Sequence, residues 1–203
     1  MKKKVTVVIA ALFLIFNIKA QSIKVSSSYG LALGETKFTK KNALYSDIQV
    51  GYEITLEKGY YLSFSIGQSS IGFDYYDQNF NSVYNDRTFI TIPVLVNKNF
   101  HNTHSGKFNL YGGIGASGSL CFRDRKKIKN FQTSTTTVIK NTGFNISLLF
   151  EGGAHILLSP KTSLNISLQP QIDVFTSYTN ELNEIKLIKN LLSFSYRLSI
   201  NKK

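Results

Sequence analysis

Apolar and polar residues alternate with a period of two along most of this chain. Between Asp47 and Leu56 every second residue is apolar, and most of the residues between them are polar or glycine. Successive side chains of a β-strand point to opposite faces, so the pattern predicts strands with one apolar and one polar face. Eight such segments follow one another, at residues 23–33, 47–56, 60–67, 90–96, 108–120, 144–158, 164–173 and 192–200.

The connections between these segments alternate between long and short. The first, third, fifth and seventh are polar stretches of roughly ten to twenty residues, and most of the others are tight, such as Glu57–Gly59. The link from Lys98 to Lys107 is longer, and we interpret it as a looser turn. Long loops at one end and short turns at the other are typical of outer-membrane β-barrels. The sequence therefore predicts an all-β fold, an eight-stranded antiparallel up-and-down transmembrane β-barrel.

An N-terminal leader precedes the first segment. Three lysines, Lys2 to Lys4, are followed by an apolar run from Val5 to Ile18 and by Ala20, a small residue suited to cleavage. We therefore expect a signal peptide at residues 1–20 and the barrel domain at residues 21–203. The alternative, an uncleaved anchor, is disfavoured because a spanning helix needs about 20 apolar residues. The only cysteine, Cys121, is far from the cleavage site, which argues against a lipoprotein.

The polar face of the segments carries serine, asparagine, glutamine and glycine more often than lysine or glutamate. A soluble β-sandwich usually turns charged residues to water, so this composition favours a crowded lumen, with the apolar face toward lipid. Eight strands leave an interior that side chains fill, so we expect no open pore. Pro93 predicts a local irregularity in the fourth segment. Candidate aromatic girdle residues are Tyr29, Tyr52, Tyr60, Phe108, Phe144 and Tyr196.

Charged residues of both signs occur on the polar face. Buried charges persist only when they are paired, so we predict that Arg197 contacts Glu53 or Glu151 across the lumen. The expected lumenal charge network consists of Glu53, Glu151 and Arg197. The other charged or titratable residues with this parity are Lys24, His155 and Asp173.

Basic residues outnumber acidic ones. Residues 21–203 contain 20 Lys+Arg against 12 Asp+Glu, a formal net charge of about +8. A nucleic-acid partner is disfavoured because only four arginines are present, no nucleic-acid motif occurs, and the leader directs export. The partners we expect are outer-membrane lipid, lipopolysaccharide and an envelope protein, and we expect a monomer. A candidate anion-binding loop contains Arg123, Arg125, Lys126, Lys127 and Lys129, although a charge run of this kind is more often a solvated loop that keeps the surface soluble.

Catalytic chemistry has little support in the sequence. Of the three histidines, His101 and His104 belong to the longer turn, and His155 follows Glu151 by four residues on the expected lumenal face. Neither a nucleophile–histidine–acid pattern nor a metal-ligand spacing is recognisable. We therefore expect no enzyme activity and no catalytic, cofactor or metal site. The aromatic, mildly acidic stretch Asp74–Asp77 is expected in a loop suited to protein contact.

Several strand motifs have counterparts in a known group of proteins. The segment from Phe89 to Phe100 (FITIPVLVNKNF), the glycine-rich Leu110–Ala116 and the closing Leu191–Ser195 resemble strands of PorT-like small outer-membrane β-barrel proteins of Bacteroidota. The resemblance implies an exported barrel, in some members tied to secretion or gliding machinery. It brings no functional residues. This chain departs from many outer-membrane barrels because it ends Ile200–Lys203 and not on an aromatic residue.

The sequence therefore predicts an outer-membrane barrel with a structural or interaction role toward protein or lipopolysaccharide, and an accessory role in secretion or surface assembly would be one form of it. One alternative is a periplasmic, lipocalin-like ligand-binding barrel, which would need an apolar interior. A more distant alternative is a barrel enzyme that modifies envelope lipids.

Overall fold

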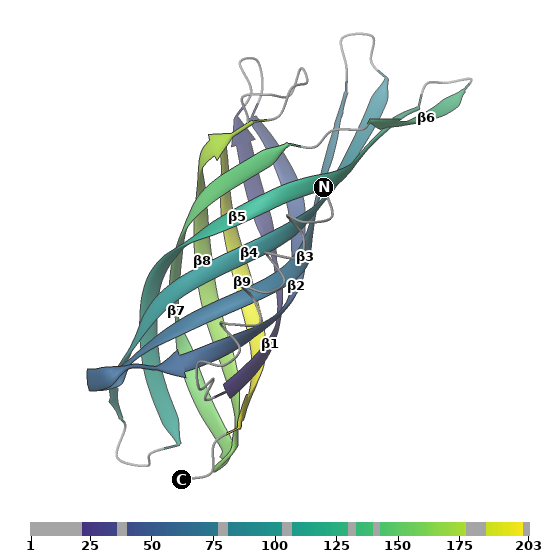
Figure 1. Ribbon diagram of the computed structural model, residues 1–203. Coiled ribbons are helices and arrows are strands. Elements are labelled where there is room, and N and C mark those ends of the chain that lie inside the picture. Colours follow the sequence, from purple (N-terminus) through teal and green to yellow (C-terminus); the bar gives the residue numbers. More distant parts are fainter. Residues whose placement is uncertain are drawn as a thin grey trace, which may run out of the picture.

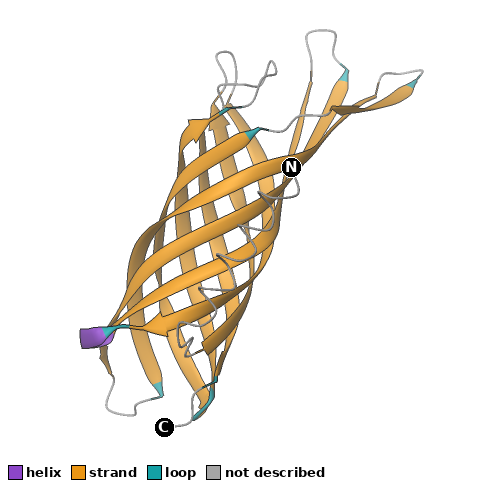
Figure 2. Cartoon of the chain, in the orientation of Figure 1, coloured by secondary structure: helices purple, strands orange, loops and turns teal. Residues whose placement is uncertain are grey.

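The computed structural model describes residues 22–35, 40–76, 81–102, 107–129, 133–139, 143–177 and 186–200. The expected signal peptide lies outside these residues. Within them the chain is a tall, closed sheet of tilted strands (Figures 1 and 2). No helix among the described residues is long and apolar enough to cross a membrane. The elements are β1 (Ser22–Glu35), β2 (Lys40–Thr55), the 3-10 turn η1 (Glu57–Gly59), β3 (Tyr60–Tyr76), β4 (Ser82–Asn102), β5 (Phe108–Lys129), β6 (Ser134–Ile139), β7 (Phe144–Ser159), β8 (Thr162–Thr176) and β9 (Lys186–Ser199).

Eight of the strands close into a ring. Each pairs antiparallel with its neighbours in the order β4-β3-β2-β1-β9-β8-β7-β5, and a β4–β5 ladder closes the ring. The first and last ring strands, β1 and β9, also pair along their whole length, from Ser22↔Ser199 to Glu35↔Lys186. This confirms the predicted eight-stranded up-and-down barrel. The ninth strand, β6, was not predicted and lies outside the ring, paired with β5.

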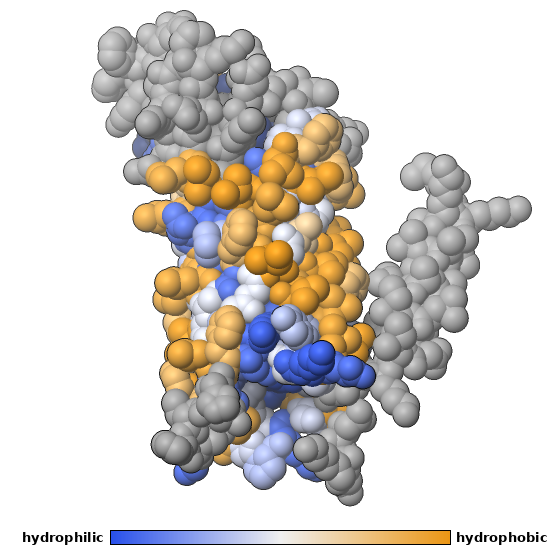
Figure 3. Space-filling view, turned by 90° about the vertical axis from the view of Figure 1, so that its left-hand side faces the viewer, coloured by the Kyte–Doolittle hydropathy of each residue, from blue (hydrophilic) through white to orange (hydrophobic). Residues whose placement is uncertain are grey.

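Side-chain direction follows the predicted alternation. Asp47 is 2% exposed and faces the lumen, whereas the next residue, Ile48, is 62% exposed on the outer wall. Every ring strand carries outward apolar residues, and Figure 3 shows an apolar surface over much of the visible barrel wall. Such a wide apolar surface is an aggregation hazard in water but matches the hydrocarbon of a membrane. Exposed aromatic residues near the short turns include Tyr60 and Phe108.

The strands are longer than the apolar pattern suggested. At the end of the barrel opposite the short turns, here called the loop end, β3 and β4 continue until only residues 77–81 separate them. Asp74–Tyr76 and Arg123–Lys129 are therefore strand and not loop, which corrects the sequence expectation. Likewise β4 extends to Asn102 and shortens the expected 98–107 link. Ladder hydrogen bonds join backbone groups, so polar side chains do not end a strand that lies outside the hydrocarbon.

At the loop end, parts of β3, β4 and β5 rise above the rest of the ring beside β6 (Figure 1). We call this four-stranded part the extension; it consists of the loop-end segments of β3, β4 and β5 that continue beyond the ring, together with β6. Its ladders pair Tyr76↔Ser82, Ser82↔Lys129 and Lys129↔Ser134. The strand β5 links the ring to the extension, because its second neighbour changes from β7 to β6 beyond Leu120.

A β-bulge marks the start of the extension on β5. Thr88 pairs with Arg123 and Phe89 pairs with Cys121, so Phe122 has no partner on β4. An extra residue on one strand bends it and exchanges the faces of all residues that follow. Below the bulge the inward residues of β5 are odd-numbered, whereas above it the buried residue is Asp124.

Glycines allow close backbone approach on the lumenal side. A Cβ added at Gly115 would overlap the Val94 carbonyl and would lie 2.8 Å from Leu95 Cα, both on β4. In the β3–β4 ladder the pairing is interrupted between Phe64↔Val94 and Gly67↔Thr91, where Pro93 lacks the N–H. The irregularity expected at this proline is therefore present.

These contacts predict different outcomes for two glycines of neighbouring strands. Gly115→Ala should lower the yield of folded barrel several-fold, because its methyl group would push β4 away from β5 where the ring closes. Gly152→Ala, on β7, should fold normally, since an added Cβ there meets nothing within 4 Å. The folded fraction can be measured as the heat-modifiable band on a denaturing gel. Equal yields for the two variants would contradict the close packing of β4 and β5.

Candidate functional site

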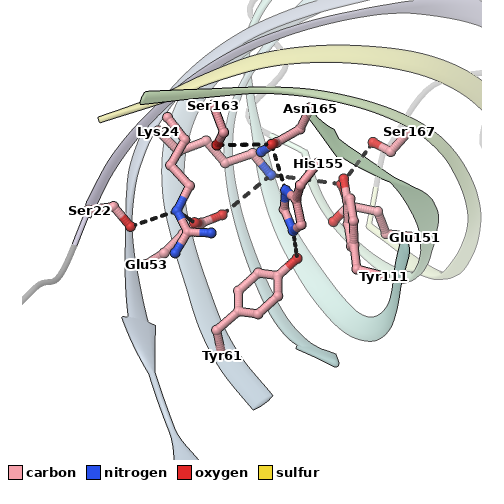
Figure 4. A network of polar contacts seen from close by, with 11 residues as sticks. Ser22, Lys24, Glu53, Tyr61, Tyr111, Glu151, His155, Ser163, Asn165 and Ser167 are labelled. Carbon is pink, nitrogen blue, oxygen red and sulfur yellow. Dashed lines mark hydrogen bonds and ion pairs between the residues drawn. The ribbon is translucent and has the colours of Figure 1, made fainter. Parts of the chain in front are cut away.

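A network of charged and polar side chains crosses the lumen near the short turns (Figure 4). Arg197 Nε of β9 lies 2.8 Å from Glu53 Oε2 of β2 and donates a hydrogen bond of 2.9 Å to Ser22 Oγ of β1. Lys24 Nζ lies 4.0 Å from Glu53 Oε1 and 3.8 Å from Glu151 Oε1. The structure thus brings Arg197 to Glu53, one of its two expected partners, while Glu151 is paired with Lys24.

Aromatic and hydroxyl groups extend this network. The Tyr111 hydroxyl donates to Glu151 Oε1 at 2.9 Å, and the Ser167 hydroxyl donates to the same oxygen at 2.8 Å. His155 Nδ1 lies 2.6 Å from Asn165 Oδ1, an acceptor, so this nitrogen carries a proton. His155 Nε2, 3.1 Å away, can then accept from the Tyr61 hydroxyl. Within the described residues, these side-chain hydrogen bonds join His155 to lumenal neighbours, an arrangement typical of interior packing.

The network is balanced and buried. Two carboxylates face two cations, and the side chains of Lys24, Glu53 and Glu151 are at most 6% exposed. Buried ion pairs give little net stability over apolar packing, but removal of one partner leaves an uncompensated charge and is strongly destabilising. The chemical role that this geometry supports is to hold the lumen filled and the first and last strands together.

Further ion pairs occupy other levels of the lumen. Lys189 Nζ lies 3.0 Å from Asp173 Oδ1, which also accepts from the Ser147 hydroxyl at 2.7 Å. At the loop end Arg87 Nε lies 3.1 Å from Asp124 Oδ2. A cavity lined by Lys24, Tyr45 and other lumenal side chains measures about 10 Å³, close to the volume that one water molecule requires.

Toward the loop end the lumen also contains an apolar cluster, beside the buried ion pairs there, and the sequence reasoning missed it. The buried cluster there contains Ala32, Ala43, Tyr45, Ile71, Phe73, Phe89, Cys121 and Leu191. The sequence does indicate this cluster where consecutive strand residues are apolar, because one of them must then face the lumen, as in Leu31–Leu33 and Leu191–Leu192. The levels of the lumen nearer the short turns are lined mainly by polar side chains, which disagrees with the lipocalin-like alternative and its apolar interior.

The residues of the expected anion-binding loop lie on β5 in the extension. Because of the bulge, Arg123, Arg125, Lys127 and Lys129 alternate on the outward face, and we call these four residues the cation row. Their cross-strand partners on β4 are Thr88, Asp86, Tyr84 and Ser82. Lys126, the fifth expected residue, has the opposite parity. Arg125 Nη2 pairs with Asp86 Oδ2 at 3.0 Å, whereas the other three members form no ion pair within the described residues.

The described part of the chain contains no cluster of side chains arranged for catalysis or metal binding. No group of three or more His, Cys, Asp or Glu residues there could hold a metal ion. His155 contacts tyrosine and asparagine and no serine–carboxylate pair. The side chains of His101 and His104 lie outside the described residues.

Three solved structures align with most of this chain. Neisserial surface protein A (NspA) aligns at a TM-score of 0.50 and 14% identity, over 88% of this chain and 97% of that chain. Ail, the attachment invasion locus protein of Yersinia pestis, aligns at 0.45 and 16% identity, over 88% and 99% of the two chains. The N-terminal barrel domain of Pseudomonas aeruginosa OprF aligns at 0.39 and 13% identity, over 88% and 98%. No protein-family model and no curated protein matches the sequence.

The likeness to NspA is a likeness of fold. Together with the closed ring and the apolar outer wall, the fold identifies this chain as an outer-membrane β-barrel and places it in the outer membrane, as the sequence predicted.

The ion network predicts a marked loss of stability on removal of Arg197. Arg197→Gln should lower the free energy of unfolding by roughly 3–5 kcal/mol, because Glu53 would stay buried without its closest cation. The double variant Glu53→Gln/Arg197→Gln should recover much of this loss. Urea titration in lipid vesicles, followed by gel mobility, measures both effects.

A matched control is Arg125→Gln, whose ion pair with Asp86 is part-exposed. Exposed ion pairs contribute about 0–1 kcal/mol, so this variant should unfold almost as the parent does. If Arg197→Gln proved no less stable than Arg125→Gln, the lumenal network would not hold the ring as described.

Proposed function

We propose that this protein is an integral outer-membrane barrel without an open pore, and that it acts through contacts at its outer surface, where the cation row binds phosphate groups of lipopolysaccharide. On this proposal residues 1–20 are a signal peptide, the barrel is a PorT-like protein that acts as a monomer, and it has no enzyme activity. A role as an accessory in secretion or surface assembly would use the same outer surface.

The position of the cation row supports this ligand. Leu120 and Phe122 are the last outward apolar residues of β5, and Arg123 follows them directly. The row therefore continues the lipid-facing wall of the barrel at the level where the hydrocarbon ends. Alternate residues on a strand lie about 7 Å apart, so the row forms a ladder of cations beside the outer leaflet, in which Arg125 is paired with Asp86. Arginine and lysine are the side chains that bind phosphate by charge-assisted hydrogen bonds.

The bulge at Phe122 gives this row its direction. Without the extra residue, the odd-numbered cations would continue the parity of Cys121 and would face inward. With it, Asp124 faces inward and pairs with Arg87, while Arg123, Lys127 and Lys129 are exposed on the lipid side.

The filled lumen supports a barrel without an open pore. Ion pairs, hydrogen-bonded tyrosines and the apolar cluster occupy successive levels of the described interior. Eight-stranded barrels have an interior just wide enough for side chains.

Neutralisation of the cation row tests the proposal. The variant Arg123→Gln/Lys127→Gln/Lys129→Gln, reconstituted in phosphatidylcholine nanodiscs, should bind lipid A at least tenfold more weakly than the parent protein. Bisphosphorylated and dephosphorylated lipid A are compared by fluorescence titration, and only the phosphorylated form should distinguish the two proteins. The affinity should fall with added salt, because the contact is ionic.

The chain offers a control with the same change in net charge. Lys98, Lys107 and Lys161 are exposed near the short turns, at the other end of the barrel. Lys98→Gln/Lys107→Gln/Lys161→Gln should therefore bind lipid A as the parent does. An equal loss in both triple variants would attribute binding to net charge alone, and no loss in the row variant would contradict a phosphate site on the extension.

A further inference from the structure

The strand β6 has an open edge. It pairs with β5 from Asp124↔Ile139 to Lys129↔Ser134, and no other strand of the described chain pairs with its second edge. Residues 134–138 are exposed. Figure 1 shows β6 at the far side of the extension, away from the ring. One row of backbone N–H and C=O groups therefore faces outward in a position that another chain can reach.

The sequence of β6 does nothing to protect this edge. Edge strands are usually blunted by charged residues, proline, a bulge or a covering segment. Residues 134–139 read Ser-Thr-Thr-Thr-Val-Ile, with five β-branched residues, no charge, no proline and no glycine. β-Branched residues favour the extended conformation that strand pairing needs. The edge is thus prepared for strand addition, a common mode of peptide recognition.

The neighbouring charges indicate which chain would fit. On the outward face Lys127 and Lys129 lie opposite Thr136 and Ser134 of β6. A strand added to β6 would lie two strand spacings from β5, about 10 Å, a distance that a lysine and a glutamate side chain together can span. An acidic segment would therefore find complementary charge beside the edge.

A second copy of this chain fits less well. Edge-to-edge pairing of two β6 strands would bring two cation rows toward each other, and each copy already carries an excess of basic residues. Like charges at such an interface oppose association.

We propose that the open edge of β6 receives an extended acidic segment of a partner protein as an additional antiparallel or parallel strand. Backbone hydrogen bonds to β6 would supply the contact, and Lys127 and Lys129 would select acidic side chains on the outward face. This edge is separate from the phosphate-binding function proposed above, with which it shares only these two lysines.

A synthetic peptide tests the edge directly. The probe is an acetylated, fluorescent eight-residue peptide of alternating Thr and Glu, titrated against the full barrel in phosphatidylcholine nanodiscs without lipopolysaccharide. Two analogues carry N-methyl groups on all Thr residues or on all Glu residues. Because N–H groups of successive residues point to opposite edges of a strand, one analogue should lose at least tenfold in affinity. Equal binding by both analogues would overturn strand addition, and so would equal binding of a Thr-Lys peptide.

Protein variants locate the contact. Thr136→Pro/Thr137→Pro removes two successive backbone N–H groups of β6, one of which points to the open edge, and should abolish peptide binding. Thr136→Val/Thr137→Val keeps the backbone and the branched shape and should bind as the parent does. Both variants should show the normal heat-modifiable band, because β6 lies outside the ring. Equal peptide binding by the proline and valine variants would contradict the proposal.

Two variants distinguish a failure of the strand-addition proposal from a failure of the lipid A site. Arg123→Gln alone should weaken lipid A binding and leave binding of the Thr-Glu peptide unchanged. The proline variant should abolish peptide binding and leave lipid A binding unchanged. If sedimentation instead showed that the parent protein is a dimer and the proline variant a monomer, the occupant of the edge would be a second copy of the chain. The acidic-partner assignment would then be wrong.

Discussion

Backbone hydrogen bonding within a lipid environment is the constraint on which the rest of this structure depends. The hydrocarbon offers no water to an unpaired N–H or C=O, so a sheet can cross it only as a closed ring. Here the closing ladders are β4–β5 and β1–β9. Closure of the ring also determines which types of residue can occupy the outward and the inward positions. Outward positions meet lipid and are apolar, and inward positions converge in a narrow space that favours small polar residues and glycine.

The lumenal charges follow from this geometry. Lys24 and Arg197 are directly opposed in the β1–β9 ladder, and both cations reach Glu53 on the next strand. The first and last strands, which are far apart in sequence, thus each place a cation beside the same carboxylate. The same side chains fill the described interior near the short turns, so they contribute both to stability and to packing of the lumen.

The sequence was informative where lipid constrains it. The alternation around Asp47 and Ile48 and the meeting of Arg197 with Glu53 could both be predicted, because each reflects the inside and outside of a closed ring. Beyond the hydrocarbon this constraint ends. Strand residues such as Arg123–Lys129 can be polar on both faces, so their pattern resembles that of a loop. The bulge at Phe122 and the pairing of β6 depend on tertiary register, which a single sequence does not reveal. The apolar cluster at the loop end was missed because alternation assigns every apolar residue to the outer wall.

The central claim is that the barrel is apolar outside and packed inside, and spin-label accessibility along β7 tests it most directly. Single cysteines at residues 145–150, in a Cys121→Ser background and in lipid bilayers, are labelled and compared for collision with oxygen and with a water-soluble nickel chelate. Our account predicts high oxygen accessibility at Ile146, Leu148 and Phe150, and low accessibility to both reagents at Asn145, Ser147 and Leu149. Accessibility without this period of two, or oxygen maxima at the inward positions, would contradict it.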